Sequence, residues 1–157
     1  MRIPGTRRSI SPDECGFRAG RFAEAVRAND MAAAWEMLSR ESQGVRQGIW
    51  GTQKGLDLQV VYQAAHDPQL PMFLPMMEDF REAVLRMWPL EDLTDLGVSP
   101  TSYIDDQHAF AFLPFGVTED RQVAPEGGAV RSGLIIPMLL EDGVWKVDLP
   151  GWRFAWA

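Results

Sequence analysis

The sequence predicts an α+β domain in which N-terminal helices pack on one face of a curved, mostly antiparallel sheet. Two features of the chain predict this arrangement. Up to about Pro89, apolar residues recur at helical spacing between capping signals and prolines. From Asp105 to Trp152, apolar runs alternate with turn signals, a pattern that is typical of neighbouring strands.

The composition predicts one globular domain spanning residues 1–157 and counts against two classes of partner. Hydrophobic residues make up 46% and charged residues 24% of the chain, which is ordinary for a globular protein. The net charge of −7 disfavours binding to nucleic acid and to anionic membrane surfaces, because both select basic faces. The single cysteine, Cys15, is interpreted as a small packing residue near a helix start, since no histidine or cationic pocket accompanies it.

The location expected from the sequence is cytoplasmic. Arg7-Arg8 is not followed by an apolar core, so these residues do not make a secretion signal. The longest apolar run, Leu134 to Leu140, is too short to span a bilayer. A leader removed ahead of residue 1 remains an alternative.

The first two helices are marked by their caps. Residues 1–10 are expected to form a loose arm, after which Ser11-Pro12-Asp13-Glu14 supplies a cap, a first-turn proline and acids near the positive end of the helix dipole. Apolar residues then recur at helical spacing through 19–26. Asn29-Asp30 ends that helix and caps a short second one with an apolar stripe over 31–38.

The middle of the chain is less regular. Residues 42–50 show a weak helical pattern with two glycines, and residues 56–65 fit both a strand and a helix, of which the helix is favoured. The strongest helix is predicted from Pro75 up to Pro89, and its methionine-rich stripe is interpreted as core. On its polar side, Glu82 and Arg86 have the i,i+4 spacing of an ion pair.

The C-terminal part contains the sheet. The pair Asp105-Asp106 is expected to turn the first strand, which Pro100 weakens, into the second. Asp142-Gly143 predicts a tight hairpin, because glycine accepts the positive φ that such a turn requires. The four strands are expected at 97–104, 107–115, 130–140 and 144–149.

Three short segments resemble the NTF2-like superfamily. Phe22-Ala23-Glu24-Ala25-Val26-Arg27-Ala28-Asn29-Asp30, with Ala33-Ala34-Trp35, resembles its first two helices. Leu140-Glu141-Asp142-Gly143-Val144-Trp145-Lys146-Val147-Asp148 resembles its last hairpin, and Gln107-His108-Ala109-Phe110-Ala111-Phe112 lies where its central strands lie. The resemblance covers residues 13–150 in order of elements, and the segment 43–74 fits it least well.

The resemblance implies a cone, in which a strongly bent sheet wraps around a long helix and leaves an apolar pocket at the open end. Members of this superfamily include isomerases, cyclases, dehydratases, ligand carriers and dimerising adaptors, so the fold alone does not determine the function. A homodimer is the expected assembly. The residues expected to line the pocket are Phe22, Trp35, Tyr62, Phe80, Tyr103, Phe110, Phe112 and Arg131.

The acid–base residues of the ketosteroid-isomerase-like members are missing here. The family's oxyanion-donating tyrosine is matched by Phe22, and its general base by a region containing Arg40-Glu41-Ser42 without the usual Asp-Pro pair. Its neutral acid is matched by Ile135-Ile136-Pro137. Proton abstraction beside a carbonyl requires a base and an oxyanion donor, so these differences count against that chemistry.

A second set of residues keeps an enzyme among the alternatives. His108 with Asp106, assisted by Tyr103 or Tyr62, could act as an Asp-oriented base if the ring faced a cavity. The competing interpretation is a polar turn with His108 at its edge. His66, in His66-Asp67-Pro68, is interpreted as a helix end.

The favoured hypothesis is a domain that binds a small apolar molecule or another protein. Neither metal nor cofactor is expected, because the sequence has no metal-ligand spacing of its two histidines and no glycine-rich phosphate loop. At the C-terminus, Trp152, Phe154 and Trp156 alternate. They are interpreted as an extra strand, a cover for the cone or a contact with a partner.

Overall fold

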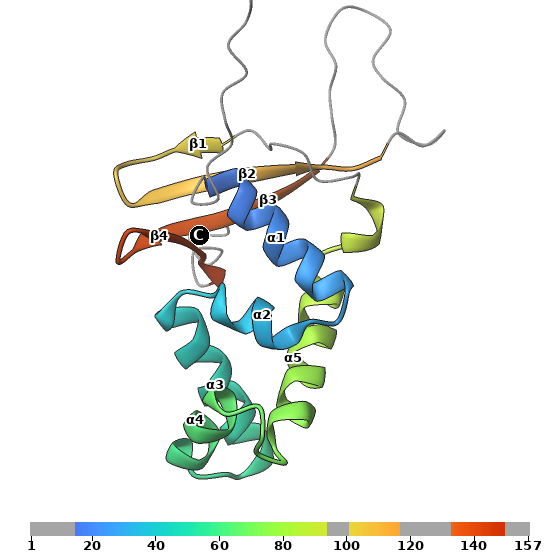
Figure 1. Cartoon of the computed structure of the whole chain (residues 1–157), viewed down its shortest axis with the longest axis vertical. Coiled ribbons are helices and arrows are strands. Elements are labelled where there is room, and N and C mark those ends of the chain that lie inside the picture. Colours follow the sequence, from blue (N-terminus) through green and yellow to red (C-terminus); the bar gives the residue numbers. More distant parts are fainter. Residues whose placement is uncertain (1–14, 94–100, 117–132, 150–157) are drawn as a thin grey trace, which may run out of the picture.

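A computed structural model describes residues 15–93, 101–116 and 133–149. This part of the chain is α+β, with helices followed by an open, four-stranded antiparallel sheet, as the sequence predicts (Figure 1). The helices are α1 (Cys15–Arg27), α2 (Met31–Glu36), α3 (Arg40–Lys54), α4 (Leu58–His66), α5 (Phe73–Met87) and the 3₁₀ turn η1 (Leu90–Asp92). The strands are β1 (Thr101–Tyr103), β2 (His108–Pro114), β3 (Gly133–Glu141) and β4 (Val144–Val147).

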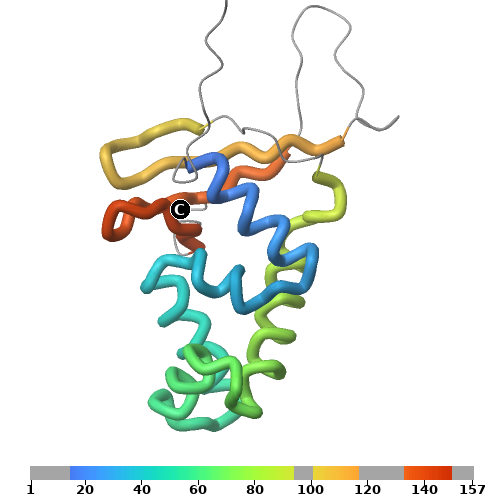
Figure 2. The backbone as a smooth tube through the Cα atoms, viewed as in Figure 1, coloured from blue at the N-terminus to red at the C-terminus, as the bar shows by residue number. Residues whose placement is uncertain are grey.

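The strands follow one another in the sheet in the order β1-β2-β3-β4, each antiparallel to the next. Helix α1 lies across the sheet and packs on β2 and β4, whereas α3 and α4 lie at the end of the molecule away from it (Figures 1 and 2). Helix α5 returns from that far end towards the sheet. The molecule therefore has a sheet end and a helical end, joined through α1, α2 and α5.

Several local predictions are confirmed. Asn29 has a positive φ of 59°, and the Asp30 side chain accepts a hydrogen bond from the Ala33 N–H at 3.3 Å, so this pair ends α1 and caps α2. Asp142 and Gly143 both have positive φ, of 51° and 76°, as a tight two-residue hairpin turn requires. The ambiguous segment 56–65 forms α4.

Helix α3 is longer than its weak pattern at 42–50 predicts. It begins after Ser39, whose hydroxyl accepts from the Ser42 N–H at 3.1 Å, and it ends at Gly55, which adopts the left-handed conformation. Gly44 and Gly48 have open space around them rather than tight neighbours. The caps at both ends therefore sustain a helix whose interior glycines weaken the sequence signal.

The prediction for the face of β2 requires a correction. Along β2 the buried residues are Ala109, Ala111 and Leu113, and they pair across the sheet with residues of β3 that are also buried. His108, Phe110 and Phe112 therefore point to the opposite face, away from α1. The physical reason is the close approach of α1, whose buried residues include Gly16, Ala19, Gly20 and Ala23.

The helical and sheet ends are joined by backbone pairing between the α2–α3 connection and β4. Leu38 forms a parallel bridge with Val147, the Val147 N–H donates to the Met37 carbonyl at 2.8 Å, and the Ser39 N–H donates to the Val147 carbonyl at 2.8 Å. Side chains reinforce this junction. The buried Ser39 hydroxyl lies 2.8 Å from both the Ser42 hydroxyl and the Asp148 carboxylate, and the Leu149 N–H donates to Ser42 Oγ.

Some predictions fall on residues outside the described ranges. These are the arm and first cap at 1–14, the beginning of the first predicted strand at 97–100, most of the loop at 116–128, Arg131, and the aromatic residues Trp152, Phe154 and Trp156.

Replacing Ser39 by alanine should lower the free energy of unfolding by about 2 kcal/mol, because it removes a helix cap and a bond to the Asp148 carboxylate. Urea denaturation followed by circular dichroism measures the change. Ser102→Ala is the control, since Ser102 lies exposed on β1, and it should change stability by less than about 0.5 kcal/mol. Equal effects of the two substitutions would contradict the role of the junction.

Candidate functional site

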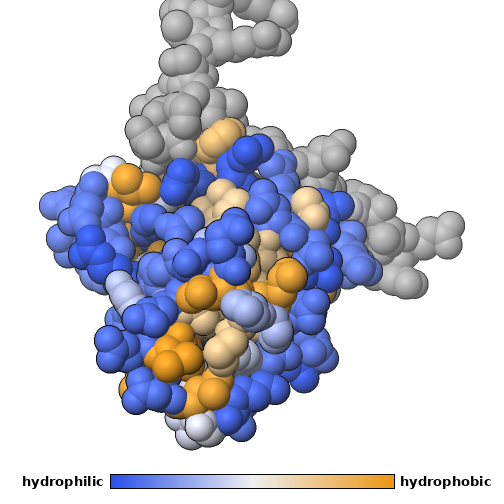
Figure 3. Space-filling view, turned by 60° about the horizontal axis from the view of Figure 1, so that its bottom comes forward, coloured by the Kyte–Doolittle hydropathy of each residue, from blue (hydrophilic) through white to orange (hydrophobic). Residues whose placement is uncertain are grey.

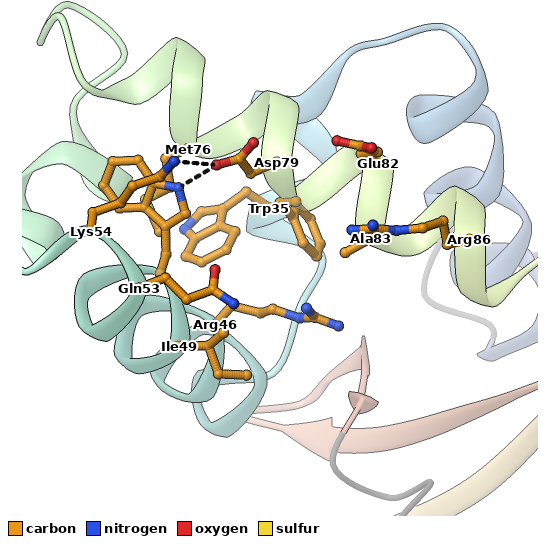
Figure 4. A pocket seen from close by; sticks show the side chains of 12 residues that line it. Trp35, Arg46, Ile49, Gln53, Lys54, Met76, Asp79, Glu82, Ala83 and Arg86 are labelled. Carbon is orange, nitrogen blue, oxygen red and sulfur yellow. Dashed lines mark hydrogen bonds and ion pairs between the residues drawn. The ribbon is translucent and has the colours of Figure 1, made fainter.

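A cavity of about 310 Å³ lies between α3 and α5, at the helical end of the molecule (Figure 4). Helix α3 contributes Arg46 and Trp50 to its wall, and these residues share one face because they are four positions apart. Helix α5 contributes Asp79 and Phe80, and α2 contributes Trp35. The cavity thus depends on three helices, of which α2 and α3 are attached to β4 at their connection.

Two aromatic rings form the inner wall. Trp35 is fully buried, and its ring meets that of Phe80 edge to face, with centroids 5.5 Å apart. The indole N–H of Trp35 has no hydrogen-bond acceptor among the described residues. A buried donor without an acceptor costs about 1–3 kcal/mol, so this N–H lowers the stability of the packing behind the cavity.

One end of the cavity is closed by a polar contact between α3 and α5. The Trp50 indole N–H donates to Asp79 Oδ2 at 2.8 Å, and Lys54 Nζ lies 3.6 Å from the same oxygen (Figure 4). Lys54 therefore neutralises the charge of Asp79. Both side chains of this ion pair are about half exposed, so the pair itself stabilises the fold by at most about 1 kcal/mol.

The other charged groups of the wall are not paired in this way. Arg46 is half-buried, its guanidinium carbon lies 5.9 Å from the centroid of the Phe80 ring, and burial lowers its pKa from the ordinary value. No carboxylate of residues 15–93, 101–116 or 133–149 lies within 4.0 Å of it. The cavity therefore contains a partly desolvated cation without a counter-charge.

Arg86 is a second cation at this cavity, and its predicted ion pair with Glu82 is not formed within the described structure. Figure 4 shows the Arg86 guanidinium extending along α5 towards the cavity, which Glu82 also lines. The exposed i,i+4 pair would gain only about 0.2–0.5 kcal/mol, which is too little to fix two flexible side chains.

The predicted pocket residues do not all come together. Trp35 and Phe80 line the cavity. Phe22 is buried in the core, where its ring meets Trp88 edge to face at 6.2 Å. Phe110 and Phe112 lie on the sheet face that turns away from α1, and Arg131 is outside the described residues.

The two tyrosines are exposed at other places. Tyr62 stacks on His66 within α4, and Tyr103 lies against Trp145 at the end of the sheet.

Sequence reasoning missed Arg46, Trp50 and Arg86 as residues of the cavity. The available signal was the i,i+4 spacing of Arg46 and Trp50, which the glycines of α3 obscured.

His108 has a carboxylate partner, but the partner is Asp105 rather than Asp106. The His108 ring Nδ1 lies 2.9 Å from Asp105 Oδ1, and the same oxygen accepts from the Gln107 and His108 backbone N–H groups at 2.8 Å. Those bonds, the Gln107 N–H first and then the His108 ring, hold the pKa of the Asp105 carboxyl below its usual value. Both side chains are about half exposed on the β1–β2 turn and do not line the cavity.

The described part of the chain contains neither a metal-ligand cluster nor a membrane-spanning helix. In residues 15–93, 101–116 and 133–149, no three His, Cys, Asp or Glu side chains gather as metal ligands would. None of the helices described is long and apolar enough to cross a membrane.

Comparison with known proteins identifies no relative. No protein-family model, curated protein or solved structure matches the chain. The chemistry of the cavity therefore has to be interpreted from its own residues.

Cys15 should not react with thiol reagents in the folded protein. Its side chain is fully buried at the start of α1, and burial raises the pKa of the thiol to about 12, although a hydrogen bond with Thr101 lowers it in part. The thiol is therefore neutral at ordinary pH, and the thiolate is the reactive form. Titration with Ellman's reagent at mildly alkaline pH should release a stoichiometric signal only after urea is added; rapid release without urea would contradict this burial.

Proposed function

We propose that this chain is a binding domain for a small molecule, and that the ligand occupies the cavity between α3 and α5. The observation that supports this proposal is a cavity of about 310 Å³ whose wall combines apolar side chains with six polar or charged ones, Arg46, Gln53, Lys54, Asp79, Glu82 and Arg86. Ligand pockets in proteins are typically about 300–1,000 Å³ and place polar groups beside apolar surface, although this wall is richer in charged groups than most.

The residues of the wall support binding rather than catalysis. Histidine, cysteine and tyrosine do not occur among the described residues of the lining, and Asp79 is held by Trp50 and Lys54. The alternative of an isomerase, cyclase or dehydratase needs His108, which lies on the exposed β1–β2 turn. A base must reach the proton that it removes, so this position gives the enzymatic alternative no support from the cavity.

Apolar surface near the cavity supports access for an apolar molecule. Exposed apolar side chains gather at the helical end of the molecule (Figure 3), where Ile49 of the cavity lining is 43% exposed and Leu74 is 67% exposed. The NTF2-like cone with its apolar pocket, the homodimer and the cytoplasmic location stay predictions. Ligand binding between α3 and α5 does not require any of them.

Filling the cavity should abolish binding of an apolar probe. Ala83, on α5, lines the cavity and is half-buried, so Ala83→Phe places a ring in the space that a ligand would occupy. N-phenyl-1-naphthylamine, an uncharged dye that fluoresces in apolar surroundings, measures the binding. We expect the wild-type protein to enhance its fluorescence and the variant to weaken the affinity by at least about tenfold, or about 1.4 kcal/mol.

The control is Glu78→Phe, which adds the same ring to an exposed position of α5 outside the cavity. It should bind the dye like the wild-type protein, and circular dichroism should show that both variants are folded. Undiminished binding to the Ala83→Phe variant would place the dye elsewhere and would contradict the proposed site.

A further inference from the structure

We infer that the ligand of this cavity is an organic carboxylate, whose charged group binds at Arg46 and Arg86 and whose apolar body lies against the accessible apolar side chains of the wall, Ile49 and Ala83. This inference rests on the proposed function, because it concerns the same cavity. It adds the charge and the shape of the ligand.

The first argument is the partial burial of Arg46 without a carboxylate partner among the described residues. Taking part of a cation out of water costs free energy, which a carboxylate partner would offset, and Arg46 is half-buried. Arg46 has no such partner among the described residues, and burial disfavours its charged form. An anion that entered the cavity would supply the missing partner.

The second argument is the unused hydrogen-bonding capacity of the guanidinium. Arg46 lies over the Phe80 ring, with 5.9 Å between the guanidinium carbon and the ring centroid. This cation–π contact uses none of its N–H groups as hydrogen-bond donors to an oxygen, and Arg46 donates no hydrogen bond to another described residue. The edge of the guanidinium carries parallel N–H donors that match the two oxygens of a carboxylate, so a bidentate pair is the interaction that this group is free to make.

The third argument is the local excess of positive charge. The whole chain has 22 acidic and 15 basic side chains, yet this cavity is lined by three cations, Arg46, Lys54 and Arg86, and by two carboxylates, Asp79 and Glu82. Lys54 and Asp79 neutralise each other, which leaves two guanidiniums and one carboxylate. Arg86 extends towards the same cavity as Arg46, so the site attracts anions although the protein as a whole repels them.

The shape of the cavity selects the rest of the ligand. Ile49, which is 43% exposed, and the half-buried Ala83 provide accessible apolar surface beside the cations, over the buried rings of Trp35 and Phe80. A volume of about 310 Å³ is at the small end of ligand pockets. An aromatic acid of one or two rings fits these conditions best.

Two nearly isosteric probes test the charge requirement. 1-Naphthylacetate and 1-naphthylacetamide share one aromatic body and differ in carrying a carboxylate or an uncharged amide, and isothermal titration calorimetry gives both affinities. We expect the wild-type protein to bind the acetate at least about tenfold more tightly than the amide, as a charge-assisted bidentate pair implies. In Arg46→Gln, the ratio of the two affinities should fall to near one.

Two further variants separate the effect of the planar Arg46 guanidinium from the effect of the net charge of the protein. Arg27→Gln removes the same charge from an exposed position outside the cavity, and it should keep the wild-type ratio. Arg46→Lys keeps the charge but loses the planar fork, so it should give an intermediate ratio. A ratio that falls equally in Arg27→Gln and Arg46→Gln would attribute the preference to net charge and overturn the assignment of Arg46.

The outcomes distinguish this inference from the proposal on which it rests. Equal affinity of the wild-type protein for acetate and amide would overturn the carboxylate assignment and leave a binding site for apolar molecules. Failure of both probes and of the uncharged dye to bind would overturn the proposed function as well. Thermal unfolding of each variant, followed by circular dichroism, ensures that loss of binding is not loss of folding.

Discussion

The rest of this structure depends on the backbone pairing between Val147 and the chain on either side of Leu38. Two hydrogen bonds of 2.8 Å, to Met37 and from Ser39, attach the α2–α3 connection to the outer edge of β4. They cover an edge that would otherwise present unpaired N–H and C=O groups, and they fix where α3 begins. Because Trp35 lies just before this junction and Arg46 lies in the helix that follows it, the same pairing sets the position of both in the cavity.

The cavity wall contains one charged side chain, Asp79, that has a partner of opposite charge and another, Arg46, that has none among the described residues. At one end, the Asp79 carboxylate accepts a hydrogen bond from the Trp50 indole and forms an ion pair with Lys54. This contact bridges α3 and α5 and leaves the charge of Asp79 neutralised. Further along the wall, the half-buried Arg46 has its guanidinium over the Phe80 ring. Lower local polarity strengthens whatever charge pair such a group forms, and it makes the absence of a partner more costly. The proposed binding site and the contact that bridges α3 and α5 thus lie on the same two helices.

Local signals in the sequence were accurate where a short-range physical requirement determined the outcome. Asp142-Gly143 required positive φ at both positions, Asp30 offered a side-chain acceptor to a new helix, and the apolar stripe between Pro75 and Pro89 had no competing period. They were insufficient for α3, because its interior glycines weaken the helical pattern in the sequence. The structure shows that caps at Ser39 and Gly55 stabilise both ends of this helix. The local signals also failed to assign His108, because alternation along β2 defines two faces without saying which one α1 covers.

The sequence by itself determined the α+β class, the hairpin at Asp142-Gly143 and the cap at Asp30, since the hairpin and the cap depend on residues within a few positions of one another and the class follows from helical and strand-like segments along the chain. Only the tertiary structure decided that α1, with its small buried residues, covers the alanine face of β2 and leaves Phe110 and Phe112 on the other side. It also decided that Arg46 of α3 meets Phe80 of α5 without meeting a carboxylate. The reason is physical: periodicity fixes which side chains share a face, whereas packing between distant elements fixes what that face touches.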